Sequence, residues 1–180
     1  MAASSSDCLI QINGGTLRLT AGSDGVDSNG LVQINGGTVL VSGPDAGMDG
    51  ALDYDISAEV TGGTILMMGS VGNTQGLDAS TQPVVYASVA GTAGQEVQLL
   101  DEQGAVLASF VAGADFSTVF ASSPQIADGQ ACSVQVGDTS TGLVMGDMLD
   151  AAQAAGMGKG RAPQVASQGE QGPGRSAGEA

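Results

Sequence analysis

Three short acidic stretches hold the residues of this chain that are best suited to chemistry. They read DGVDSNG at 24–30, GALDYDI at 50–56 and QGLDAST at 75–81. In each stretch an apolar residue precedes an aspartate, and these aspartates are Asp27, Asp53 and Asp78. Their near-constant spacing predicts that they stack in one column. Stacked carboxylates repel one another unless a cation neutralises them, and Ca²⁺ takes roughly six to eight oxygen ligands in flexible geometry.

The candidate calcium ligands lie in this column and in the turns beside it. They are Asp24, Asp27, Asn29, Asp49, Asp53, Asp55 and Asp78. Softer metals are not expected, because histidine is absent and the two cysteines are far apart. A second interpretation stays open, since Asp and Asn also form ordinary solvated turns. Tyr54 and Asp45 are candidate ligand-binding residues, Tyr54 because an exposed ring in an acidic turn could stack on a sugar.

The charge balance limits the partners. The chain has 180 residues, with 19 acidic and four basic ones, and a formal net charge of −15. Arg18 is the only cation in residues 1–150. Such a surface repels nucleic-acid phosphates and anionic membranes, and no apolar run is long enough to span a bilayer. We therefore expect no nucleic-acid partner and no membrane insertion. The oligomeric state is left open.

A repeat must position the acidic column. QINGGT stands at 11–16 and again at 33–38, and EVTGGT stands at 59–64. Short strands of alternating apolar residues flank each glycine pair, as in one turn of a parallel β-helix. We expect an all-β, single-stranded parallel β-helix of about three to four coils over residues 1–83. The bend between the two strands favours glycine, which permits positive φ and close backbone approach.

The register of the repeat ends near residue 84. Residues 84–138 read as antiparallel strands with hairpin turns, one of them at DEQG, and predict a β-rich cap. We expect the cap, the tail or another chain to cover an apolar stripe of Leu40, Leu66 and Met68. Residues 139–180 predict a short helix at 145–156 and then a disordered tail rich in Gly, Ala and Gln. Cys8 and Cys132 are expected as free residues, with a disulfide left open.

Three phrases of the sequence carry a family resemblance. They are INGGTVLVSGPDAGMDGALDYD, VTGGTILMMGS and LASFVAGADFSTVFASSPQIADGQACSVQVGD. Over roughly residues 8–138 the chain resembles the carbohydrate-binding parallel β-helix proteins of clostridia and other gut and soil bacteria, which are related in architecture to pectate lyases. The resemblance implies a calcium-binding protein, with Asp27/Asn29 and Asp53/Asp55 as ligands, that binds cellulose or acidic sugars such as polygalacturonate. It also implies an extracellular or cell-surface location, although MAASSSDCLI contains no signal peptide.

Three functions compete on this sequence. The first is non-catalytic, calcium-dependent binding of a polysaccharide, either an acidic one or cellulose. The second is a polysaccharide lyase, which needs a general base, and Arg18 is the only basic residue outside the C-terminal tail. The third is a structural or adhesive repeat that binds no glycan. We expect the first, and we expect no enzymatic activity.

Overall fold

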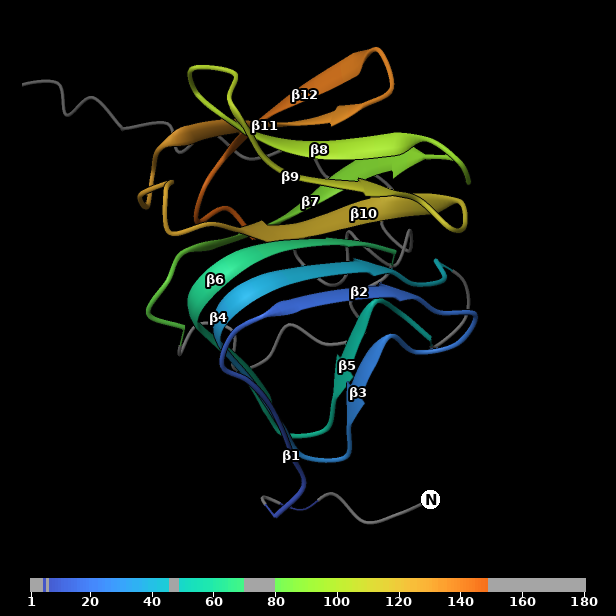
Figure 1. The fold of residues 1–180 in the computed structure, drawn as a ribbon, viewed down its shortest axis with the longest axis vertical. Coiled ribbons are helices and arrows are strands. Elements are labelled where there is room, and N and C mark those ends of the chain that lie inside the picture. Colours follow the sequence, from blue (N-terminus) through green and yellow to red (C-terminus); the bar gives the residue numbers. More distant parts are fainter. Residues whose placement is uncertain (1–4, 6, 46–48, 70–79, 149–180) are drawn as a thin grey trace, which may run out of the picture.

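The computed structural model describes residues 5, 7–45, 49–69 and 80–148, and these residues form strands and turns. Twelve strands follow one another along the chain (Figure 1). They are β1 (Leu9–Ile12), β2 (Thr16–Thr20), β3 (Val26–Ser28), β4 (Leu31–Ser42), β5 (Leu52–Tyr54), β6 (Ser57–Met68), β7 (Val84–Gly91), β8 (Glu96–Asp101), β9 (Val106–Val111), β10 (Phe116–Ser122), β11 (Ala131–Val136) and β12 (Thr139–Val144). Among the described residues, no helix is long and apolar enough to cross a membrane.

The strands form three sheets. The main sheet runs β1-β4-β6-β10-β7, with β2 also paired to β4. The outer sheet runs β12-β11-β8-β9 and is antiparallel throughout. The third sheet consists of β3 and β5, which are parallel. The prediction of a single parallel β-helix is therefore wrong, because the main sheet is mixed and the outer sheet is antiparallel.

Strand β10 is the reason for the difference. It pairs antiparallel with β6 on one side and with β7 on the other, so the main sheet continues past the last repeat. Its sequence is FSTVFAS, and it buries apolar side chains on both faces of the main sheet. Phe120 lies in the hydrophobic core on one face, and Val119 and Ala121 lie in the hydrophobic core on the opposite face. A strand buried on both faces belongs in the middle of a sheet and not over its end.

Within the main sheet the repeats stack in parallel and in register. Gln11 lies beside Gln33, and Gln33 beside Glu59, while Thr16, Thr38 and Thr64 form a second column. The second glycine of each pair has positive φ, which glycine adopts without the steric cost of a side chain. We call the successive windings coil 1 (residues 9–30), coil 2 (31–56) and coil 3 (from 57).

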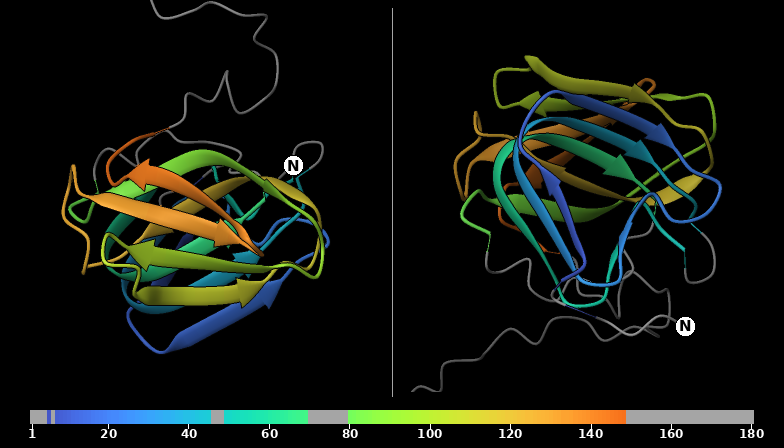
Figure 2. Two further views of the ribbon diagram at one scale, coloured as in Figure 1. Left: turned by 90° about the horizontal axis from the view of Figure 1, so that it is seen from above. Right: turned by 60° about the horizontal axis from the view of Figure 1, so that its bottom comes forward.

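Two hydrophobic cores lie on opposite faces of the main sheet. Figure 2 shows the outer sheet lying against one of these faces. The inner core fills the coils and contains Val39, Val41 and Ile65, together with Phe120 from β10. The outer core lies between the main and outer sheets and contains the stripe Leu40, Leu66 and Met68. Of the three coverings left open for this stripe, the structure shows the strands after residue 84, and all three side chains are at most 1% exposed.

The remaining sequence predictions concern the hairpins, the cysteines and the C-terminus. The turn predicted at DEQG joins β8 and β9, with the Gly104 N–H donating to the Asp101 carbonyl. Cys8 and Cys132 are free thiols, exposed and buried respectively. Strand β12 ends at residue 144, and most of the helix predicted at 145–156, like the tail after it, lies outside the described residues.

Candidate functional site

The acidic turns are held by β3 and β5. The two strands pair in parallel, with Val26 beside Leu52 and Asp27 beside Asp53. Side chains alternate along a strand, so Val26 and Leu52 point into the coil and the two aspartates point outward. Adjacent strands lie about 4.8 Å apart, which brings these carboxyl groups close together. The predicted stacking of Asp27 and Asp53 is confirmed, and Asp78 lies outside the described residues.

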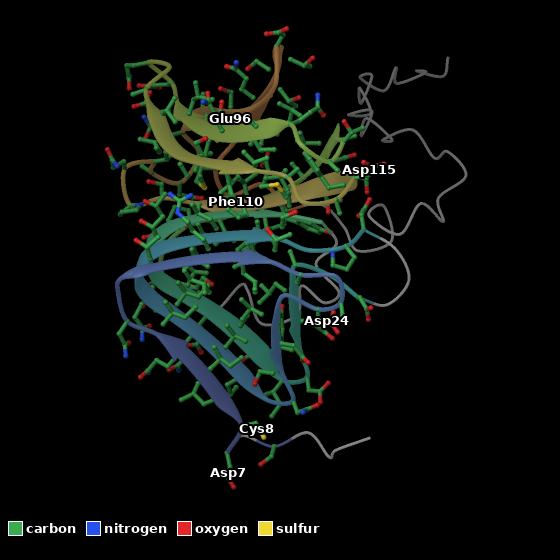
Figure 3. The ribbon with its side chains drawn as sticks, turned by 45° about the vertical axis from the view of Figure 1, so that its right-hand side comes forward. Asp7, Cys8, Asp24, Glu96, Phe110 and Asp115 are labelled. Atoms are coloured by element: carbon green, nitrogen blue, oxygen red, sulfur yellow. The ribbon has the colours of Figure 1, made fainter. Side chains whose placement is uncertain are left out.

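Three of the carboxylates fasten backbone or side chains in the acidic turns, which Figure 3 locates by Asp24. Asp24 Oδ1 of coil 1 accepts a hydrogen bond from the Gly50 N–H of the adjacent coil 2 at 2.8 Å. Asp49 Oδ2 accepts one from Ser23 Oγ at 3.4 Å. Asp53 Oδ1 accepts one from the Tyr54 N–H at 2.9 Å. These carboxylates therefore serve the local fold, as turn-forming aspartates do.

Asp53 has an unfavourable electrostatic environment. Partial burial raises the pKa of its carboxyl group, and the neighbouring carboxylates Asp24, Asp27 and Asp55 raise it further. The hydrogen bond from the Tyr54 N–H acts in the opposite direction and is outweighed. The charged form of Asp53 therefore reduces the stability of the fold.

Replacing Asp53→Asn should raise the melting temperature at pH 7. Because folding raises the pKa, the ionised carboxylate of Asp53 lowers the stability of the folded state. This loss of stability is fully present above the pKa of the folded state and shrinks as the pH falls through that pKa. It is absent below the ordinary pKa of 3.8. The gain should therefore disappear near pH 3.5, while the amide oxygen of Asn can still accept from the Tyr54 N–H. Thermal melts in EDTA at the two pH values measure this.

The matched control is Asp138→Asn, at an exposed turn between β11 and β12, which should leave both melting temperatures unchanged. A lower melting temperature for Asp53→Asn at pH 7 would contradict the electrostatic account.

Calcium binding at the acidic turns stays a prediction for the described residues. Among them no group of three or more Asp, Glu, Cys or His side chains is arranged to hold a metal ion. Asp27, Asn29 and Asp55 are exposed, and Asp45 and Asp49 are partly buried. Tyr54 is 2% exposed, with its side chain on the same face as Leu52 in the inner core. This corrects the expectation of a ring available to a sugar.

The structure brings together a second polar array, on the outward face of β1, β4 and β6. We call it the amide ladder: Gln11, Asn13, Gln33, Asn35 and Thr61. Gln11 Nε2 donates to Gln33 Oε1 at 2.9 Å, and Asn13 Nδ2 donates to Gln11 Oε1 at 3.0 Å. Asn35 Nδ2 donates to Asn13 Oδ1 at 2.8 Å, and Thr61 Oγ1 donates to Asn35 Oδ1 at 2.7 Å.

These hydrogen bonds order the ladder and leave part of its capacity unused. The bonds occupy one N–H of each of Gln11, Asn13 and Asn35, whereas a side-chain amide has two N–H donors and an oxygen with two lone pairs. All four bonds lie at the exposed surface. The sequence analysis identified the repeat that contains Gln11 and Gln33 but assigned these residues no role. The signal was the exact repetition of QIN at 11–13 and 33–35.

Neither family models nor curated proteins nor solved structures gave a match to this chain. The resemblance to carbohydrate-binding β-helix proteins stays a prediction.

Proposed function

We propose that this protein is a non-catalytic carbohydrate-binding protein and that the amide ladder is its binding face. The observation that carries the proposal is the repetition of exposed, mutually hydrogen-bonded amides on successive coils. Parallel strands repeat about every 4.8 Å, so the face offers donors and acceptors at regular steps. A polysaccharide offers hydroxyl groups at regular steps, and each hydroxyl both donates and accepts.

The order of the ladder favours binding. An amide already fixed by its neighbours loses less conformational freedom when a ligand arrives than a free surface side chain does. Gln33 is central, because it accepts from Gln11 and both of its own N–H groups remain for a ligand.

Charge selects the class of glycan. The chain carries a net charge of −15 and would repel a polyuronate, whereas a neutral polymer of the cellulose type meets no such repulsion. We therefore propose a neutral, extended polysaccharide as the ligand of the amide ladder. The proposal includes no catalysis.

A second candidate is calcium-dependent binding of an acidic glycan at the acidic turns. The raised pKa of Asp53 favours it, because a bound cation would relieve the repulsion among Asp24, Asp27, Asp53 and Asp55. Against it stands the lack of a metal-ligating group among the described residues. A ligand that binds only the folded state raises its stability, by about 2.7 kcal/mol at a hundredfold excess over Kd. Calcium should therefore raise the melting temperature only if this second candidate is correct.

The test of the amide ladder is calorimetric titration with cello-oligosaccharides in EDTA. Replacing Gln33→Ala should weaken binding about five- to tenfold, since each lost hydrogen bond contributes about 1 kcal/mol. The control is Gln103→Ala, an exposed amide in the turn between β8 and β9, which should bind as the wild type does. If Gln33→Ala lowers the melting temperature but leaves binding unchanged, the ladder only stabilises the stack and the proposal fails.

A further inference from the structure

Among the described residues, coil 1 presents an unpaired sheet edge. Strand β10 covers the edge of β6, but on the other side of the stack β1 and β2 pair only with β4 among the described strands (Figure 2). The inward side chains of coil 1 show the consequence. Ile10, Ile12, Leu17 and Leu19 are only partly buried, whereas the residues below them, Val32, Ile34, Val39 and Val41, are at most 1% exposed.

Hydrogen-bond directions show which backbone groups this edge presents. In an extended strand the N–H and C=O of one residue point to the same side, and successive residues alternate. The Cys8 carbonyl accepts from Leu31, so Cys8, Ile10 and Ile12 face β4, and Leu9, Gln11 and Asn13 face outward. The Gly15 carbonyl accepts from Thr38, and the Ala21 N–H donates to Ser42. Consequently Thr16, Arg18 and Thr20 also face outward.

We propose that this edge is a homodimer interface in which coil 1 of one copy stacks on coil 1 of a second copy. A twofold axis that passes between Gly14 and Gly15 places β1 of one copy against β2 of the other. The core-facing sides of the two coils then lie over each other. The facing pairs are then Leu9 with Thr20, Gln11 with Arg18, and Asn13 with Thr16. All six are outward-facing residues, and each pair can exchange two backbone hydrogen bonds, as in an antiparallel ladder.

The same register matches the side chains. Ile12 of one copy faces Leu17 of the other and Ile10 faces Leu19, so the two partly exposed core ends cover each other. Arg18 faces Gln11 and not the second Arg18. The guanidinium already lies over the Phe110 ring, 6.0 Å from its centroid, and so remains on the outer side.

The glycine corner fits the same contact. A Cβ at Gly36 would lie 3.0 Å from the Asn13 carbonyl oxygen, and one at Gly62 would lie 2.5 Å from that of Asn35, because each corner touches the coil before it. A Cβ at Gly14 would meet nothing within 4 Å, and the φ of Gly14 is not positive. Position 14 therefore carries the glycine that close stacking of a coil requires. In the described structure, however, it is the one corner of the three with no coil stacked before it.

The charge distribution favours a second copy as the occupant. Residues 8–23 contain no acidic residue and include Arg18, although residues 1–150 contain 17 acids. The edge strands are short and carry Arg18, but they have no proline, no inward-pointing charge and no bulge, which are further features that protect free strands from pairing. Along β1 and β2 the two copies therefore bring together no carboxylates and only Arg18 as a charged side chain, while the carboxylates of coil 1, Asp24 and Asp27, lie at β3. Added salt should strengthen the dimer by screening the rest of the surface.

Sedimentation of the full chain, from about 1 to 100 μM, tests the proposal. We expect a monomer–dimer equilibrium, and Gly14→Val should weaken it at least tenfold without changing the monomer's stability. The control is Gly22→Val, another open position, which should dimerise normally. A chain that stays monomeric throughout, or a dimer that tolerates Gly14→Val, would overturn the proposal.

Cross-linking tests the register independently of affinity. In a Cys8→Ser background, Gln11→Cys and Arg18→Cys are prepared as separate variants. Facing residues of a hydrogen-bonded antiparallel pair have Cα atoms about 5.5 Å apart, within disulfide range. Oxidising the mixed variants should give a covalent dimer, and oxidising either alone should not. A covalent dimer from either variant alone would refute the twofold register.

Discussion

Gly62→Ala should lower the free energy of unfolding by about 3 kcal/mol, although it adds one methyl group. The new Cβ would lie 2.5 Å from the Asn35 carbonyl oxygen and 3.2 Å from its carbon. These atoms belong to the backbone of the preceding coil and cannot move aside as a side-chain tip does. The main sheet must therefore open at this corner or the coils must shift. Urea denaturation followed by circular dichroism measures the loss.

The control for this prediction is Gly142→Ala in β12. A Cβ there would meet nothing within 4 Å, and its φ is not positive. In an open position of this kind alanine is at worst neutral and can stabilise by reducing the entropy of the unfolded chain. Equal stability of the two variants would show that the coils are not in the close contact described.

Phe120→Ala should lower the free energy of unfolding by about 4 kcal/mol, as large-to-small changes at buried aromatics do. Phe120 is 0% exposed and lies in the inner core with Val39 and Ile65, although it comes from β10, far along the chain. Its removal leaves a cavity among the repeats. We expect one cooperative transition, shifted as a whole, because the main sheet joins repeats and C-terminal strands.

The control for Phe120 is Phe110→Ala on β9. Phe110 is partly buried and packs against the outer core, where Figure 3 shows it between the outer sheet and the coils. Its removal should cost clearly less. Two separate transitions for Phe120→Ala, with the coils melting as in the wild type, would mean that residues after 84 form an independent cap.

The register of the repeats could be predicted because it follows from local rules. Apolar alternation and the glycine pairs placed Gln11 beside Gln33 and Asp27 beside Asp53, and the pairing of the strands is the same. The buried position of Tyr54 was also readable, because Leu52 and Tyr54 are two residues apart and share one face. The exposed-ring expectation weighed the acidic neighbours of Tyr54 above this alternation.

The place of β10 could not be predicted in the same way. Its pairing with β6 joins Val119 to Met68, residues distant in sequence, and no repeat signals it. Alternation reports which side chains share a face but not which strand covers a free edge. The hydrogen bonds of the amide ladder and of Asp24 likewise depend on side-chain conformations that residue types alone do not specify.

Affinity electrophoresis tests the proposed function most directly. The full chain runs in native gels that contain either hydroxyethyl cellulose or polygalacturonate, each with EDTA and with calcium. We predict retardation by the neutral glycan in both conditions, its reduction in Gln33→Ala, and no retardation by polygalacturonate. Retardation by polygalacturonate only when calcium is present would contradict the amide ladder as the binding face and assign binding to the acidic turns instead.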